Sequence, residues 1–226
     1  KNKKVIGADI NQSVVDLVSE GEEPFPGEAD LGKRLREVID NGMLTATTNT
    51  TEAVRKSDYV IVVVPVIVNN QGVPDFTAID AATNDIAKGL KAGCLISYET
   101  TLPIGTTRNR FLPALESKSG LKCGIDFFLC HSPERVFSGR IFADLRKYPK
   151  LVGGTDSESS RKAAEFYKQI LDFDHRADLK EPNGVWDLGT CEAAEMAKLA
   201  ETTYRNVNIA LANEFALHAQ DLGLDI

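Results

Sequence analysis

The sequence predicts an α/β protein built on a doubly wound parallel sheet and followed by one long helix. Along the first 180 residues, short β-rich runs alternate with segments whose apolar residues recur at helical spacing. Several of the short runs are apolar on both faces, as strands sandwiched between helices require. The run Cys191–Leu217 then continues a helical pattern for longer than any segment before it. This alternation is typical of a doubly wound α/β fold.

The strand candidates are short, rich in β-branched residues and separated by polar or turn-forming stretches. They are Val5–Ala8, Leu44–Thr48, Tyr59–Val64, Leu95–Tyr98, Phe127–Cys130 and Lys150–Val152. The longest apolar run, Tyr59–Val68, is about half as long as a membrane-crossing helix and is broken by Pro65. We therefore interpret it as a buried strand.

The helix candidates between these strands carry apolar residues three and four positions apart. They are Gln12–Ser19, Asp30–Asn41, Ile79–Lys88, Thr107–Leu115 and Ser157–Leu171. The next stretch, Asp172–Gly189, is rich in charged residues, glycine and proline, and we expect it to be a linker. Thr190 follows and is a suitable N-cap for the long helix, because its hydroxyl can accept a hydrogen bond from a free N–H of the first turn.

Charge and cysteine content limit the classes of function. The chain has a net charge of −7 and a pI near 5.1 without a basic cluster, which argues against a nucleic-acid surface. No signal-type apolar segment opens the chain, so we expect a soluble cytoplasmic protein with no membrane partner. The spacing of Cys94, Cys123, Cys130 and Cys191 fits no metal site, and we expect free thiols in a reducing compartment.

The long helix presents two different faces. Lys198, Thr202 and Arg205 stand at positions i, i+4 and i+7, which places two cations and a hydroxyl on one side. This side is a candidate anion or oxyanion site, although two cations on a helix also suit a solvated surface. The opposite side gathers the apolar groups of Met196, Leu199, Ala200, Thr203, Val207, Ala210 and Leu211.

Candidate cofactor residues follow the ends of two strands, where parallel sheets bind ligands. Asp9 closes the first strand, and a carboxylate there can accept hydrogen bonds from the adenosine ribose of a dinucleotide and disfavour a 2′-phosphate. An Asp at a strand end is also a common turn residue. The accompanying glycine loop would lie roughly 20 residues upstream, before Lys1. Val64 and Pro65 end the most apolar strand, where proline stops the ladder because it has no N–H.

Two further strand ends carry polar groups. The segment 99–107 offers Thr101 and other hydroxyls, a proline-restrained turn and a glycine at the start of a helix, which suits a polar ligand. Glu134 follows the strand candidate Phe127–Cys130 and comes directly after Pro133. A carboxylate there could activate water as a general base. Each of these segments alone could be an ordinary loop. Only their occurrence together in one sequence indicates a functional site.

Together these motifs resemble the UDP-glucose/GDP-mannose dehydrogenase family, the nucleotide-sugar 6-dehydrogenases, over nearly the whole chain. The motifs are the Asp9 strand, the Val64-Pro65 end, the turn 100–106 (TTLPIGT), the segment 132–136 (SPERV) and the helix segment 194–201 (AEMAKLAE). Within the family, SPERV and the run 201–208 (ETTYRNVN) are similar to the branch that acts on UDP-N-acetylhexosamines such as UDP-N-acetylmannosamine. The glucose branch typically follows its Pro-Glu with Phe-Leu.

The resemblance implies a Rossmann-like NAD-binding domain in an enzyme that oxidises a sugar C6 alcohol to a carboxylate by two hydride transfers and through a thioester. The implied cofactor is NAD and the implied substrate is a UDP-sugar. The cofactor-binding positions would be Asp9, Val64, Pro65, Thr101 and Glu134. The catalytic positions would be Lys198, which stabilises an oxyanion, Glu134, which activates the hydrolytic water, Thr101 and Thr202. The substrate-binding positions would be Arg135, Val136, Lys198, Thr202 and Arg205.

The sequence also departs from the family. Thr202 stands where the family usually has Asn, and a hydroxyl cannot reproduce both ends of an amide. Ser138 replaces an acidic residue of the glucose branch. The family's nucleophile lies in a Gly-Gly-x-Cys-x-Pro-Lys-Asp type of segment that this sequence lacks, and Cys191 does not have that context. We therefore expect a fragment, with residues 1–185 forming most of the NAD-binding domain and residues 186–226 starting a central helical dimerisation domain.

Other interpretations remain open at this point. UDP-glucose 6-dehydrogenase is a related activity. A β-hydroxyacid dehydrogenase also places a lysine on an interdomain helix, although the segment 132–136 argues against it. A non-catalytic α/β module that dimerises through the long helix is the alternative from another class. A homodimer is expected in either class, so NAD binding is the observation that separates an enzyme from such a module.

Overall fold

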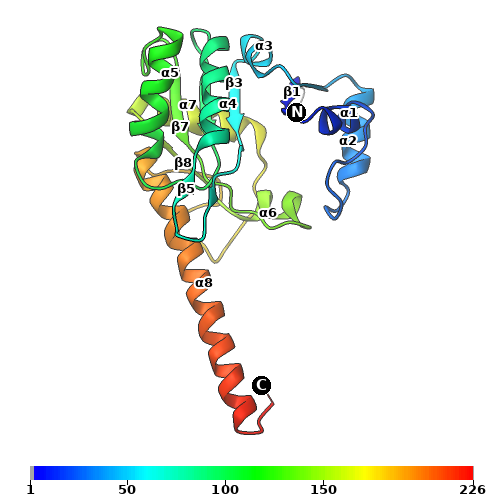
Figure 1. The fold of residues 1–226 in the computed structure, drawn as a ribbon, viewed down its shortest axis with the longest axis vertical. Coiled ribbons are helices and arrows are strands. Elements are labelled where there is room, and N and C mark those ends of the chain that lie inside the picture. The colour runs from blue at the N-terminus through cyan, green and yellow to red at the C-terminus, as the bar shows by residue number, and fades with distance from the viewer. Residues whose placement is uncertain (1–2, 226) are drawn as a thin grey trace.

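The computed structural model describes residues 3–225 and shows a sheet covered by helices on both faces (Figure 1). The strands are β1 (Val5–Ala8), β2 (Leu44–Thr47), β3 (Tyr59–Val62), β4 (Ile67–Val68), β5 (Pro74–Asp75), β6 (Leu95–Tyr98), β7 (Phe128–His131), β8 (Lys150–Gly154) and β9 (Val185–Asp187). The helices are α1 (Gln12–Ser19), α2 (Leu31–Asp40), α3 (Thr50–Arg55), α4 (Thr77–Gly89), α5 (Leu112–Ser119), α6 (Ile141–Lys147), α7 (Ser157–Ile170) and α8 (Cys191–Asp221). A short π-helix, η1 (Thr107–Phe111), precedes α5.

The main sheet has the strand order β3-β6-β7-β8-β9. β3, β6 and β7 run parallel, with Tyr59 opposite Leu95 and Leu95 opposite Phe128. β8 then pairs antiparallel with β7 and parallel with β9. The predicted doubly wound α/β class is confirmed, with a sheet that is mainly rather than wholly parallel. Because β3, β6 and β7 share one direction, their carboxyl ends lie along one edge, where such sheets bind ligands.

β1 and β2 form a separate parallel pair, with Val5 opposite Leu44. Together with α1 and α2, this pair lies to one side of the main sheet (Figure 1). Within residues 3–225 no strand pairs with the outer edges of β1 and β3, and Tyr59 and Ile61 on β3 keep 41% and 44% of their surface exposed. Asp9 is therefore carried by this smaller unit, and the other predicted site residues by the main sheet and α8.

Aromatic side chains pack on both faces of the main sheet. On one face, the rings of Tyr98 and Phe111 stack with centroids 4.3 Å apart in a core that α4 and α5 complete. On the other, Phe166 of α7 stacks on Tyr59 at 4.4 Å. Full burial of a side chain of this size stabilises the fold by roughly 2–3 kcal/mol. These contacts hold the strand ends in fixed positions.

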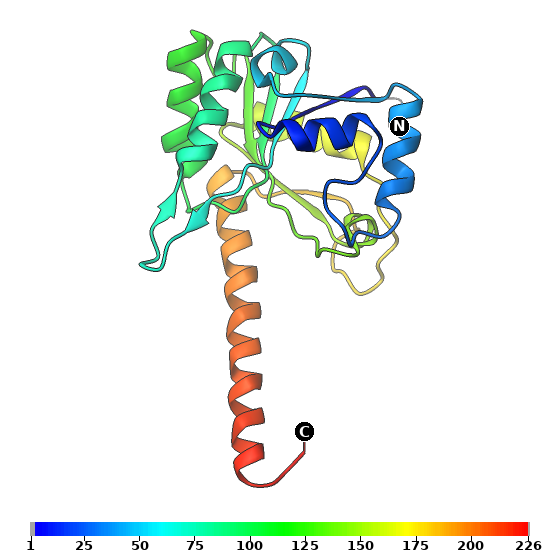
Figure 2. The ribbon, with the colours of Figure 1, turned by 45° about the vertical axis from the view of Figure 1, so that its right-hand side comes forward.

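α8 begins inside the body of the protein and then leaves it (Figure 2). Thr190 caps it as predicted, since its hydroxyl accepts a hydrogen bond from an N–H of the first turn at 3.2 Å. Gly153 of β8 permits the close approach of this helix start, because a Cβ there would collide with the carbonyl group of Thr190. Farther along, Met196, Val207 and Leu211 of the predicted apolar stripe keep 51%, 59% and 53% of their surface exposed.

Several short elements were not expected from the sequence, namely α3, the β4–β5 hairpin, α6 and β9. Short elements show too few repeats of a hydrophobic pattern to be recognised. β9 lies inside the stretch Asp172–Gly189, which was expected to be a linker, and there it extends the main sheet. The predicted helix Thr107–Leu115 starts as η1 and continues as α5 to Ser119, where Gly120 ends it with a φ of 73°.

No helix in the described part of the chain, residues 3–225, is long and apolar enough to cross a membrane. Cys94, Cys123, Cys130 and Cys191 are all free thiols. Over the same residues, no group of three or more His, Cys, Asp and Glu side chains is arranged to hold a metal ion.

Candidate active site

The segments that follow β3, β6 and β7 are tied to one another by hydrogen bonds. The hydroxyl of Thr100 donates to the carbonyl oxygen of Val64 at 2.7 Å. The N–H of Glu134 donates to the carbonyl oxygen of Glu99 at 3.1 Å. β3 itself ends at Val62, two residues before the predicted end. The three strand ends with predicted site residues therefore form one connected edge of the main sheet.

The segment 99–107 is anchored on both sides of Thr101. Thr101 is exposed, while its neighbour Leu102 is buried in the core under α4. Gly105 has a φ of +84°, which disfavours any side chain, and a Cβ there would also lie 2.8 Å from the amide nitrogen of Asn109. The start of η1 is held by the carboxylate of Glu195 on α8, which accepts hydrogen bonds from this segment. Thr101 is thus presented to solvent by a fixed loop.

The carboxylate of Glu134 is oriented by its own loop. Its Oε1 accepts hydrogen bonds from the N–H groups of Arg135 and Val136 at 2.5 and 2.8 Å. Pro133 and Ser132 before it are buried, and Glu134 itself is half-buried. One oxygen of this carboxylate is therefore used to fix its position, which leaves the other for a ligand.

Lys198 lies against the same loop. Its ammonium group donates a hydrogen bond to the backbone carbonyl oxygen of Glu134. Burial lowers the pKa of Lys198 below its ordinary value, and the nearby carboxylates of Glu201 and Glu134 oppose that shift. Lys198 is therefore a half-buried lysine beside a predicted catalytic carboxylate, and not a lysine of a solvated helix face.

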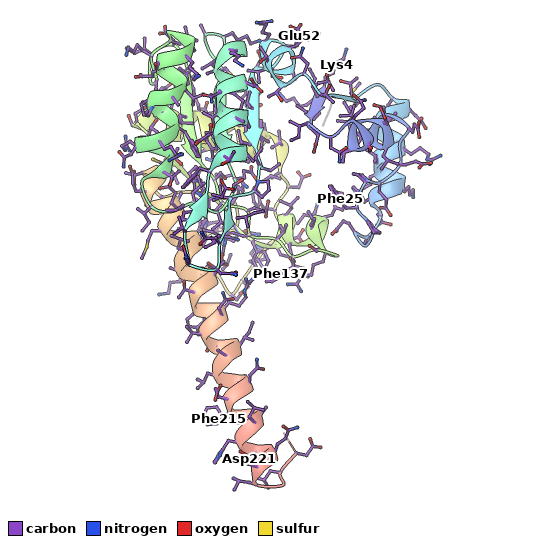
Figure 3. All side chains as sticks on the ribbon, viewed as in Figure 1. Lys4, Phe25, Glu52, Phe137, Phe215 and Asp221 are labelled. Atoms are coloured by element: carbon purple, nitrogen blue, oxygen red, sulfur yellow. The ribbon has the colours of Figure 1, made fainter. Side chains whose placement is uncertain are left out.

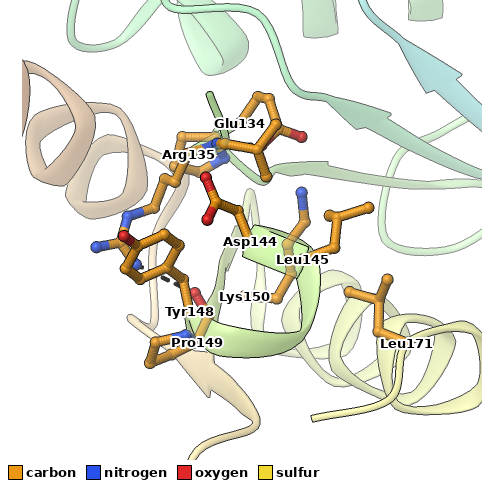
Figure 4. Close-up of a pocket in the computed structure, with 10 residues that line it drawn as sticks. Glu134, Arg135, Asp144, Leu145, Tyr148, Pro149, Lys150 and Leu171 are labelled. Carbon is orange, nitrogen blue, oxygen red and sulfur yellow. Dashed lines mark hydrogen bonds between the residues drawn. The ribbon is translucent and has the colours of Figure 1, made fainter. Parts of the chain in front are cut away.

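Arg135 braces the loop against α8 and against the turn between α6 and β8, where Tyr148 and Pro149 lie beside it (Figure 4). Its Nε and Nη2 donate to the two carboxylate oxygens of Glu201 at 2.9 and 2.7 Å, and its Nη1 donates to the carbonyl oxygen of Pro149 at 3.1 Å. This bidentate contact lowers the pKa of Glu201. The small cavity beside Arg135 holds about 20 Å³, which is room for one water molecule and not for a sugar nucleotide.

Thr202 and Arg205 complete the polar face of α8. The hydroxyl of Thr202 donates to the carbonyl oxygen of Lys198 at 2.8 Å, so towards a ligand it can act only as an acceptor. Phe137 lies beside α8 (Figure 3), and the guanidinium of Arg205 lies 5.4 Å from the centre of its ring. The predicted face Lys198, Thr202 and Arg205 therefore runs along the loop that starts at Glu134.

The residues present fit part of an NAD site. Asp9 is exposed at the end of β1, and its Oδ1 accepts a hydrogen bond from the N–H of Asn11 at 2.8 Å. No donor within residues 3–225 is bonded to its Oδ2, which can accept a hydrogen bond from a ribose hydroxyl. Val64 and Pro65 lie just past the end of β3, with Pro65 exposed. A dinucleotide held by Asp9 and Thr101 would span the smaller unit and the main sheet.

A buried ion pair beneath this edge was missed in the sequence. The ammonium of Lys150 lies 3.0 Å from the carboxylate of Glu99, and the hydroxyl of Tyr167 donates to the same carboxylate at 2.5 Å. Lys150 also donates to the carbonyl oxygen of Ser132 at 3.4 Å. Burial raises the pKa of Tyr167 well above its ordinary value, so its hydroxyl remains a donor. Glu99 and Lys150 lie about 50 positions apart in the sequence, and such a separation gives no local signal that the two charges will pair.

A mainly parallel sheet with polar side chains along the carboxyl ends of β3, β6 and β7, together with a separate parallel strand pair that ends at Asp9, is the arrangement of a Rossmann-type dinucleotide-binding protein. The chain belongs to the UDP-glucose/GDP-mannose dehydrogenase family. Residues 1–171 match the family's NAD binding domain, and residues 192–226 match its central domain. The predicted boundary at residues 185 and 186 lies between these two ranges.

Curated relatives and solved structures agree with this assignment. A UDP-N-acetyl-D-mannosamine dehydrogenase from Pyrococcus horikoshii is 33% identical over 222 residues, which cover 98% of this chain and 50% of that protein. The enzyme of the same name from Escherichia coli K12 is 32% identical over 232 residues, covering 100% and 51%. The chain spans about half the length of the curated relatives it matches.

The solved structure of UDP-D-ManNAc dehydrogenase from Pyrococcus horikoshii superposes with a TM-score of 0.87 at 32% identity, over 99% of this chain and 50% of that one. A ternary complex of GDP-mannose dehydrogenase from Pseudomonas aeruginosa also gives a TM-score of 0.87, at 25% identity, over 99% and 49%. The fold of this chain is therefore that of the nucleotide-sugar dehydrogenases, and NAD is the cofactor of the domain it carries.

Proposed function

We propose that the whole protein is an NAD-dependent dehydrogenase that oxidises the C6 alcohol of a UDP-N-acetylhexosamine, UDP-N-acetylmannosamine, to the carboxylate. The observation that carries this proposal is the hydrogen bond from the Lys198 ammonium to the Glu134 backbone. It places a cation and a carboxylate together at the sheet edge, next to the segment of Thr101. A cation and a carboxylate are two of the groups that an alcohol oxidation followed by thioester hydrolysis requires. The thiol that would form the thioester belongs to the segment that this sequence lacks.

Lys198 would stabilise the negative charge that develops on the substrate oxygen. An ammonium group has three donors, and the carbonyl oxygen of Glu134 uses one of them. A preorganised donor in a partly dry site contributes about 3–4 kcal/mol of transition-state stabilisation. NAD, when bound, accepts the hydride from the sugar carbon. Thr101, exposed on its fixed loop, would line this site.

Glu134 would act as the general base that activates the hydrolytic water. Hydrogen bonds from Arg135 and Val136 hold its Oε1, so Oε2 is the oxygen placed to receive a proton. Arg205 and the Arg135–Glu201 pair would shape the substrate side of the site. The pair holds the 132–137 loop against α8.

The N-acetylhexosamine substrate is supported by two observations. The segment 132–136 reads SPERV, which departs from the Pro-Glu-Phe-Leu typical of the glucose branch. The relatives from Pyrococcus horikoshii and Escherichia coli both carry the name UDP-N-acetyl-D-mannosamine dehydrogenase. We extend the proposal to a homodimer through α8, because Val207, Leu211 and Phe215 keep 59%, 53% and 61% of their surface exposed. Phe215 lies on the part of α8 that projects from the body of the protein (Figure 3).

The full-length gene product, purified and supplied with NAD, tests the activity. NADH formation would be followed by absorbance with UDP-N-acetylmannosamine, UDP-glucose and GDP-mannose at equal concentrations. We expect the highest kcat/KM with UDP-N-acetylmannosamine. A preference for UDP-glucose would contradict the proposed substrate and leave the dehydrogenase activity standing, whereas no NADH with any nucleotide sugar would contradict the proposed function.

A further inference from the structure

Glu195 makes an unusual set of contacts for a glutamate on a helix. Its side chain is fully buried, and its carboxylate leaves α8 to meet the start of η1. Oε2 accepts a hydrogen bond from the N–H of Gly105 at 2.5 Å. Oε1 accepts one from the N–H of Thr107 at 2.9 Å and one from its hydroxyl at 2.7 Å. The carboxylate thus binds three donors of a segment about 90 positions earlier in the chain.

These bonds replace the cap that the helix start lacks. Thr106 precedes η1, but its hydroxyl donates to the carbonyl oxygen of Pro103 at 2.7 Å and makes no capping bond to the helix. The free N–H groups of a buried helix start need an acceptor. A carboxylate supplies two oxygens, and negative charge is favourable at a helix N-terminus. Glu195 therefore fixes the end of the segment that presents Thr101.

The same helix holds the second loop of the site. Lys198 follows Glu195 by three positions, so both side chains lie on one face of α8. Glu195 binds the segment 99–107, and Lys198 binds the backbone of Glu134. One turn of α8 therefore fixes the positions of two loops that follow different strands.

We propose that Glu195 is a positioning residue, which holds the Thr101 segment at a fixed distance from Lys198 and Glu134. This inference rests on the proposed function, in which these three groups act on one substrate. Glutamine at this position keeps one oxygen acceptor but turns an NH₂ group towards a backbone N–H, so one of the two backbone bonds is lost. The segment 99–107 then shifts relative to α8, while the residues proposed to touch the substrate keep their own side chains.

The test compares Glu195→Gln with Glu192→Gln in the full-length protein. Glu192 is a matched control because it also joins α8 to η1, through an ion pair with Arg108 at 2.5 Å, but does not bond the segment 99–107. Both variants should lose stability. For Glu195→Gln alone we expect kcat with the nucleotide sugar to fall about 10- to 100-fold, because the Thr101 segment is displaced from Lys198 and Glu134. KM should stay within about twofold of the wild-type value.

Two readouts separate positioning from a merely structural role. The first is the primary isotope effect with substrate deuterated at C6. It should rise in Glu195→Gln, because hydride transfer becomes slower, and stay at the wild-type value in Glu192→Gln. The second is hydrogen exchange of the Gly105 and Thr107 amides in the full-length protein. In Glu195→Gln it should become faster by about tenfold or more beyond the change at the amides of the main sheet, and in Glu192→Gln it should change no more than those amides do.

A normal kcat and isotope effect in Glu195→Gln would overturn the inference, as would equal losses in both variants with an unchanged isotope effect. Unchanged exchange of the two amides would overturn it as well. If the wild-type protein makes no NADH with any nucleotide sugar, the proposed function fails, and the exchange experiment alone then decides whether Glu195 fixes the segment.

Discussion

Replacing His131 with leucine should remove a loss of stability that the wild-type protein suffers in mild acid. His131 ends β7, is fully buried, and neither of its ring nitrogens has a hydrogen-bond partner within residues 3–225. Burial lowers its pKa to about 3, and the ammonium of Lys150 adds to this shift. Leucine is close in volume, and Leu129, two positions earlier on the same face of β7, lies in the core.

The magnitude follows from proton linkage. In the unfolded chain the imidazole titrates near its ordinary pKa of about 6.5, so below that pH the unfolded state binds a proton that the folded state does not. His131 thus costs no stability above about pH 6.5, and the cost grows as the pH falls from about 6.5 towards about 3. The slope is about 1.4 kcal/mol per pH unit, which gives about 2 kcal/mol between pH 7.5 and pH 5.

Urea unfolding followed by circular dichroism at pH 7.5 and pH 5 measures this difference. The wild type should lose about 2 kcal/mol more unfolding free energy than His131→Leu over that interval, because titration of the other groups is common to both proteins. His175→Leu, at an exposed position, is the matched control and should behave like the wild type. The same pH dependence in wild type and His131→Leu would refute the linkage argument.

Three further outcomes are expected. Lys198→Ala in the full-length protein should lower turnover by at least about 100-fold, measured as NADH formation, and normal turnover would rule out its oxyanion role. The ion pair with Arg108 lowers the pKa of Glu192 to about 2, so its stabilisation is present above the unfolded pKa of about 4.3 and is lost as the pH falls towards 2. Solvent screens this pair, because Arg108 and Glu192 keep 38% and 30% of their side-chain surface exposed. Glu192→Gln should therefore cost about 1–2 kcal/mol at neutral pH and almost nothing near pH 2 in urea titrations, and a constant difference would contradict this. Leu211→Glu should convert the proposed homodimer to a monomer in light scattering, while Glu214→Gln should not, and a dimeric Leu211→Glu protein would exclude α8 as the interface.

Hydrophobic periodicity alone located the helices and strands that are long enough to repeat their apolar pattern several times. α1 has the predicted bounds, and α8 begins at the predicted residue. The strand β9 was missed because Val185–Asp187 is too short to show alternation and sits in a stretch rich in charge, glycine and proline. The antiparallel direction of β8 was missed for a different reason, because a strand's composition does not record which way its neighbour runs.

By itself the sequence determined the α/β class, the two faces of the long helix and the order of motifs that gives the family. The first two follow from local periodicity, and the third follows from the linear order of short motifs along the chain. Only the tertiary structure decided what each polar group bonds to. Arg135 is held by Glu201, which lies 66 positions away, and Glu195 reaches a segment about 90 positions away. Such partners depend on the path of the whole chain, which local spacing does not specify.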